Sequence, residues 1–222
     1  MFYSYNGLPD DARQPTISTQ LVMAMGGILA KYDLLEKVGI HLIHGHFNLP
    51  VDTILVGSNY GDCRWTKATT LDVLDLNNIH GHVFVCTERG FHAYECQTGP
   101  LPDLSGVDVG AFLEEFASFL KKNKLETVVG LELISSRDAA PMSELILSSS
   151  LQTIMAPDFK KCLDTRQTGW QFRHESGELR VCGQTYHAKS SKGHDPFEFN
   201  APEPILDTFE DLRCALGKQG IW

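Results

Sequence analysis

The sequence lacks closely spaced cysteines and long basic runs, and each absence excludes a class of protein. The six cysteines are widely spaced and form no C-x-x-C pair, which excludes a zinc ribbon or zinc finger and predicts reduced, mostly buried thiols. No run of Lys and Arg is longer than Lys121-Lys122, and the formal net charge is -9. An acidic surface repels phosphate groups, so we expect no nucleic-acid partner and no polybasic membrane patch.

Long apolar runs are also missing. The first one, from Leu21 to Ala30, is interrupted by Gly26-Gly27 and is too short to span a bilayer. Residues 1–15 are polar and contain no apolar core of signal-peptide length, and we expect residues 1–17 to be irregular. These features predict a cytoplasmic protein without a membrane partner.

Several well-known motifs do not occur. The sequence has no G-x-G-x-x-G, no Walker loop, no G-x-S-x-G elbow and no H-E-x-x-H pair. The nucleotide-binding and hydrolase folds that carry these signatures therefore have no support.

The composition and the periodicity of the remaining chain indicate a globular α+β fold. With 222 residues and 42% apolar content, one domain over residues 1–222 is expected. Apolar residues at helical spacing predict helices over 18–37, 107–122 and 205–216. Short apolar runs predict strands at 40–47, 53–57, 64–71, 79–86, 91–97, 125–134, 145–150, 169–174 and 179–189. We therefore expect a mostly antiparallel sheet with two to three packed helices.

Two matching tripeptides are the unusual feature of this sequence. His44-Gly45-His46 and His80-Gly81-His82 each fall on a predicted strand. Residues i and i+2 of a strand project from the same face, so each tripeptide should present two imidazoles side by side.

The second tripeptide belongs to a predicted hairpin that turns at residues 87–90. The resulting register places Glu95 opposite His82 and Gln97 opposite His80, on one face. His80, His82 and Glu95 would form a site of two histidines and one carboxylate, as used for zinc or non-haem iron, and His44 and His46 could add ligands. The same three residues could instead act as general acid and base on a small-molecule ligand.

Three interpretations of the histidines stay open: a metal site, a metal-free functional pocket, and a structural role on a solvated polar face. Cys86 shares the predicted face of His80 and His82, but a buried, inert thiol is the expected alternative to a nucleophile. Glu132 alternates with apolar residues on its strand. It is expected on a solvated face or, less commonly, in a pocket with a raised pKa.

The segment from Gly39 to Phe47, and the later hairpin from Trp170 to Cys182, resemble segments of small proteins of filamentous fungi with a histidine-x-histidine-phenylalanine strand. The resemblance covers a minor part of the chain; it implies a fungal source and no particular activity. Two functions of different kinds are expected from the residues. One is a small-molecule enzyme with a histidine- and carboxylate-lined pocket, and the other is a non-catalytic interaction module. The sequence does not indicate an oligomeric state.

Overall fold

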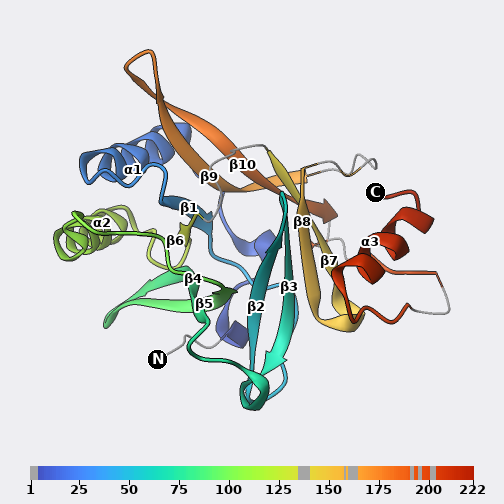
Figure 1. Ribbon diagram of the computed structural model, residues 1–222. Coiled ribbons are helices and arrows are strands. Elements are labelled where there is room, and N and C mark those ends of the chain that lie inside the picture. The colour runs from blue at the N-terminus through green and yellow to red at the C-terminus, as the bar shows by residue number, and fades with distance from the viewer. Residues whose placement is uncertain are drawn as a thin grey trace.

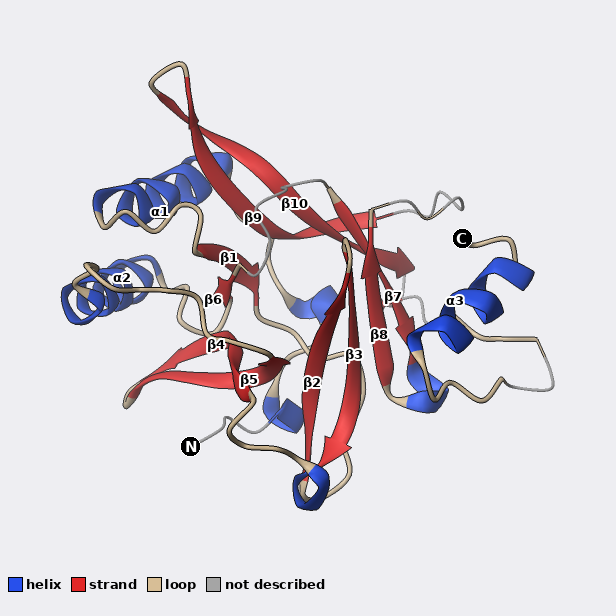
Figure 2. Ribbon diagram, viewed as in Figure 1, coloured by secondary structure: helices blue, strands red, loops and turns tan. Residues whose placement is uncertain are grey.

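The chain folds around a closed, mixed β-barrel (Figures 1 and 2). The computed structural model describes residues 5–134, 141–157, 159, 165–190, 193–194, 197–200 and 204–222. In this part of the chain the strand order is β11-β10-β7-β8-β3-β2-β5-β4-β6-β1-β9, and a further pairing of β9 with β10 closes the ring. The short strand β11 lies outside the ring.

Most neighbouring strands are antiparallel, but two pairs are parallel: β2 with β5, and β10 with β7. The strands are β1 Val38–Leu42, β2 Thr53–Tyr60, β3 Cys63–Thr70, β4 Ile79–Thr87, β5 Gly90–Thr98, β6 Val129–Leu133, β7 Met142–Leu147, β8 Gln152–Ala156, β9 Thr165–Glu175, β10 Glu178–Ser190 and β11 Gly193–His194. Closure pairs both edge strands and so leaves the ring no open edge.

Three α-helices lie outside the barrel: α1 (Thr19–Lys31), α2 (Val109–Asn123) and α3 (Phe209–Lys218). Each has a side-chain cap at its N-terminus, provided by Ser18, Asp108 and Thr208 respectively. None of the helices in the described residues is long and apolar enough to cross a membrane.

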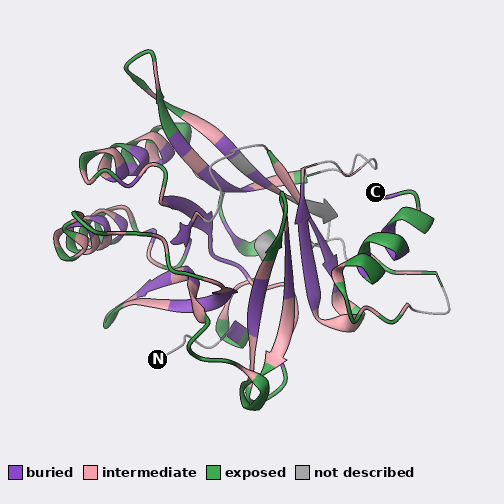
Figure 3. Ribbon diagram, viewed as in Figure 1, coloured by how far each residue is buried: buried purple, intermediate pink, exposed green. Residues whose placement is uncertain are grey.

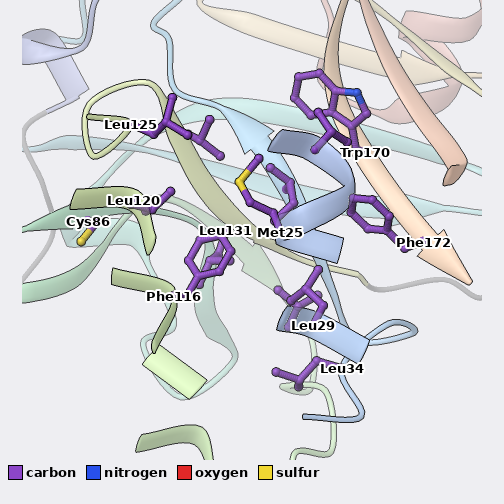
Figure 4. Packing of buried hydrophobic residues seen from close by; sticks show 14 of the residues in the cluster. Met25, Leu29, Leu34, Cys86, Phe116, Leu120, Leu125, Leu131, Trp170 and Phe172 are labelled. Atoms are coloured by element: carbon purple, nitrogen blue, oxygen red, sulfur yellow. The ribbon is translucent and has the colours of Figure 1, made fainter. Parts of the chain in front are cut away.

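The helices cover two separate sides of the barrel (Figure 1). Helices α1 and α2 pack against the outer faces of β1, β6 and β9, where Met25, Leu29 and Phe116 lie beside Leu131 and Phe172 (Figure 4). Helix α3 covers β3, β7 and β8 through a second apolar cluster. That cluster consists of Trp65, Leu145, Leu147, Ile154, Leu212, Leu216 and Ile221. The buried residues concentrate on the strands and on the helix faces that meet them (Figure 3).

The α+β class, the three helices and the predominance of antiparallel pairs agree with the sequence. Closure of the sheet into a barrel and its two parallel pairs were not predicted, and neither was strand β8. The first helix is shorter than expected, because the chain turns at Asp33, which has a positive φ of 57°, and Gly39 already belongs to β1.

The predicted strand over 40–47 is also too long. Strand β1 ends at Leu42, so His44-Gly45-His46 lies beyond it, in a segment where Gly45 forms an isolated bridge with Asp10. The prediction that both tripeptides lie on strands is therefore wrong for the first one. His80-Gly81-His82 does lie on β4.

Candidate functional site

On the inner face of the barrel, polar side chains lie beside an apolar cluster that includes Val83 and Val85 of β4. On β1, Ile40 and Leu42 point outward into the cluster under α1 and α2, so the intervening His41 points inward. Glu132 alternates in the same way with the outward Leu131 and Leu133 of β6. Side chains of six further residues join these two in the barrel or at its end: His44, His46, Arg64, His82, Glu95 and Glu144.

Glu132 lies between two imidazoles. Its Oε2 is 3.5 Å from His41 Nδ1 and its Oε1 is 3.3 Å from His82 Nε2. Burial alone would raise the pKa of this carboxyl, but the contacts with His41 and His82 outweigh burial and lower it. The pKa of His82 is lowered to about 4, by burial and by the charge of Arg64, so His82 is neutral near pH 7. Burial opposes protonation of His41 as well, yet Glu132 raises the pKa of this imidazole.

Arg64 holds a second buried carboxylate. Its guanidinium lies 3.3 Å from Glu95 Oε2, and its Nε donates a hydrogen bond of 2.8 Å to Gln97 Oε1. Gly57 on the neighbouring strand makes room for this side chain, because a Cβ at that position would lie 2.5 Å from Arg64 Nε. Burial raises the pKa of Glu95 although Arg64 opposes the shift, and the charge of Glu144 raises it further.

The third group consists of His44, His46 and Glu144. The Nε2 atoms of the two histidines are 3.0 Å apart, and His46 Nε2 is 3.6 Å from Glu144 Oε2. One ligand atom from each residue lies within 4.8 Å of the others. The side chains of His46 and Glu144 are only 3% and 5% exposed. Among the described residues, these three form the group that could hold a metal ion.

The tautomer of His44 suits this role. Its Nδ1 lies 2.6 Å from the carbonyl oxygen of Leu42, so Nδ1 carries the proton and donates it to that oxygen. Nε2 is then the unprotonated nitrogen that faces His46. On the other side, the ring of His41 stacks on that of His44 with centroids 5.3 Å apart. A backbone carbonyl and a neighbouring ring thus fix the orientation of this imidazole.

The N-terminal segment holds the His44–His46 loop in place. Tyr5 Oη accepts a hydrogen bond of 2.9 Å from the backbone N–H of His46, and the Pro9 carbonyl accepts one of 2.9 Å from Gly45. The side-chain amide of Gln14 donates to the carbonyls of Ile43 and Thr127. The part of residues 1–17 that the structure describes is therefore ordered by its contacts with the loop, and it includes the short helices η1 (Tyr5–Gly7) and η2 (Asp11–Arg13).

The distances in this group fit a transition-metal ion. Metal–ligand bonds of about 2.1 Å place adjacent ligand atoms about 3.0 Å apart in octahedral geometry and about 3.4 Å apart in tetrahedral geometry. The observed separations of 3.0 and 3.6 Å lie close to these values. The barrel also carries an excess of acidic groups, because three glutamates but only one arginine are buried in the described part of the chain.

The structure separates the residues that the sequence grouped together. His80 Nδ1 lies 3.0 Å from the Gly99 carbonyl, whereas His82 contacts Glu132 and Glu95 contacts Arg64. Gln97 is opposite His80 as predicted, but Val83, not His82, is opposite Glu95. The reason is a pair of compensating register shifts, between Gly81 and Val83 and between Val83 and Phe84, and the extra residue of β4 at His82 re-aims this side chain. The predicted pairing of His82 with Glu95 is wrong for this reason.

Four residues of the barrel interior were not predicted as site residues: His41, Arg64, Glu132 and Glu144. Glu132 is not on a solvated face, and although it lines a cavity its pKa is not raised, because the contacts with His41 and His82 lower it. A charged residue beside apolar residues on a predicted strand could have indicated these inward side chains. Glu144, which directly precedes Leu145-Ile146-Leu147, is an example. Cys86 is buried in the outer cluster, and burial raises the pKa of its thiol, which agrees with an inert cysteine.

The fold and the site define a class: a closed mixed β-barrel whose interior holds buried histidines, glutamates and one arginine beside an apolar cluster. Comparison with protein-family models, curated proteins and solved structures gives no match to this chain. The function therefore has to be argued from the geometry of the site.

Proposed function

We propose that the protein is a metal-dependent small-molecule enzyme that holds a divalent transition-metal ion through His44, His46 and Glu144. The observation that carries this proposal is the convergence of three ligand atoms within 4.8 Å inside the barrel. Two imidazoles and one carboxylate suit Zn²⁺ and Fe²⁺, and three protein ligands leave coordination positions open for a reacting molecule.

Two further observations support a cation at this position. The Nδ1–H of His44 donates to the Leu42 carbonyl, an arrangement typical of metal-binding histidines. A divalent ion would also offset the surplus of buried carboxylates over Arg64. When bound, such an ion supplies Lewis-acid chemistry or lowers the pKa of a ligated water.

The chain's own residues would support that chemistry. His41 stacks on His44 and contacts Glu132, so it connects the ligand group with the pair of His82 and Glu132. His82 offers a neutral imidazole near pH 7, because its pKa is about 4. It can therefore accept a hydrogen bond from a substrate without bringing a charge of its own.

Metal binding by the purified, untagged protein tests the proposal. The protein is stripped with a chelator and titrated with Zn²⁺, and with Co²⁺ as an optical probe of ligand geometry. We expect one ion per chain, at least a tenfold weaker affinity in His44→Ala and Glu144→Gln, and unchanged affinity in the matched control His80→Ala. Equal losses in all three variants, or unchanged binding in the first two, would overturn the assignment.

A further inference from the structure

A small cavity opens beside the pair formed by His82 and Glu132. Its volume is about 50 Å³. Its wall comes from the β2–β3 hairpin and from β4, β6, β7, β8, β9 and β10. The lining residues include Arg64, Met142 and Thr185 in addition to His82 and Glu132. None of His44, His46 or Glu144 lines it, so this site goes beyond the proposed metal site and does not depend on it.

Neither ring nitrogen of His82, which lines this cavity, makes a hydrogen bond of ordinary geometry in the described part of the chain. The side chain of this residue is 3% exposed, and its Nε2 lies 3.3 Å from the Glu132 carboxylate. Nε2 faces the carboxylate in this contact, whereas Nδ1 is equally buried and has no partner at all among the described residues. Buried polar atoms are rarely left in this state, so a molecule in the adjoining cavity is the natural partner of Nδ1.

The carboxylate decides which kind of hydrogen bond Nδ1 can form. Because the contacts with His41 and His82 lower the pKa of Glu132, this carboxyl is ionised, and the nitrogen that faces it at 3.3 Å, Nε2, is the one that carries the proton of the neutral ring. A neutral imidazole carries one proton only, so Nδ1 is an acceptor. The molecule in the cavity must therefore present an O–H or N–H donor.

The charges around the cavity favour a neutral molecule. Arg64, Glu132 and Asp62 all line the cavity, so a charged ligand of either sign would lie near a side chain of like charge. An anion would lie near the ionised Glu132, while the guanidinium of Arg64 is already bonded to Glu95 and Gln97. A water molecule needs about 10–15 Å³ of such volume, so 50 Å³ holds about three to five non-hydrogen atoms.

We propose that this cavity binds a small neutral alcohol or amide, whose O–H or N–H group donates a hydrogen bond to Nδ1 of His82. The ring would be held for this contact by Glu132, which makes Glu132 a positioning residue. With so few atoms, the ligand should bind with a dissociation constant no tighter than tens of micromolar.

Four probes of nearly equal size test the proposal on the metal-free protein: acetamide, acetone, acetate and acetamidinium. Only acetamide is a neutral molecule with an N–H donor. Long-range ¹⁵N NMR of the histidine side chains should report a protonated Nε2 and a bare Nδ1 in His82. The Nδ1 signal should shift with acetamide and stay in place with the other three probes.

Two variants identify the site. Met142→Phe, at another residue of the wall, places a larger side chain in the cavity, and it should abolish the acetamide shift while the signal of His82 keeps its tautomer. His80→Ala, outside the cavity, should leave binding unchanged. A protonated Nδ1, an equal response to acetone, or no response to any probe would overturn the proposal; the last result would mean that water is the only partner. Because no metal is present, these outcomes are independent of the metal-binding test.

Discussion

The imidazole of His82 lies against the carboxylate of Glu132, with Nε2 and Oε1 3.3 Å apart, on the adjacent strands β4 and β6. Both side chains are almost completely buried. A carboxylate in such a place is costly unless donors surround it, and His41 provides the second one. The protonation of this cluster is therefore coupled to the stability of the fold.

The lowered pKa of His82 predicts a loss of stability in mild acid. Its folded-state pKa is about 4, below the ordinary value of 6.5, so the unfolded chain binds more protons between these values. The free energy of unfolding should fall by up to about 3 kcal/mol on this account as the pH drops from 6.5 to 4. Urea unfolding at several pH values measures the slope. His82→Gln should flatten it, whereas His80→Gln should keep it; equal slopes in all three proteins would contradict the prediction.

Removing the charge of Glu132 should destabilise the protein at neutral pH. Glu132→Gln leaves His41 and His82 buried without their carboxylate, at an expected cost of about 3 kcal/mol. The pKa of Glu132 is lowered on folding, so its stabilisation is present above the unfolded-state value of 4.5 and is lost as the pH falls below it. The difference between wild type and variant should therefore shrink below pH 4.5. Glu88→Gln, at an exposed turn, is the matched control and should unfold like the wild type.

Arg64 and Glu95 should behave as a coupled pair. Arg64→Met leaves the Glu95 carboxylate buried without its cation, at a cost of about 3–5 kcal/mol. The double variant Arg64→Met, Glu95→Gln no longer contains the unpaired buried charge. Its loss of unfolding free energy should therefore be smaller than the sum of the losses in the two single variants. A double-mutant cycle from chemical denaturation measures the coupling. Additivity within about 0.5 kcal/mol would show that the two side chains do not interact.

The sequence predicted those parts of the fold that depend on neighbouring residues. The β4–β5 hairpin has its predicted register at His80 and Gln97, because a short turn between alternating strands sets the pairing locally. The register shift at His82 could not be predicted, since the alternation of the two strands continues through it, and it places His82 in contact with Glu132 on a strand distant in the sequence.

The candidate site was predictable only in part, for the same reason. His44 and His46 were recognisable as a pair, but Glu144 joins them only because closure of the barrel brings the start of β7 to the segment after β1. Hydrophobic periodicity assigns residues to faces and does not reveal which strands meet around a ring. The inward charges of Arg64, Glu132 and Glu144 were visible in the sequence, but their partners were not.

The glycine pair of helix α1 offers a test of the packing outside the barrel. A Cβ on Gly26 would lie 2.6 Å from the ring of Phe172, whereas a Cβ on Gly27 would meet nothing within 4 Å. The close approach of helix α1 to β9 is therefore made at Gly26. Gly27→Ala should raise the free energy of unfolding by about 1 kcal/mol, since alanine favours the helix. Gly26→Ala should lower it, because the buried Phe172 ring has to move out of a packed cluster. Thermal and urea unfolding of the two single variants measure the contrast. Changes of the same sign and size would mean that α1 does not approach β9 as closely as this.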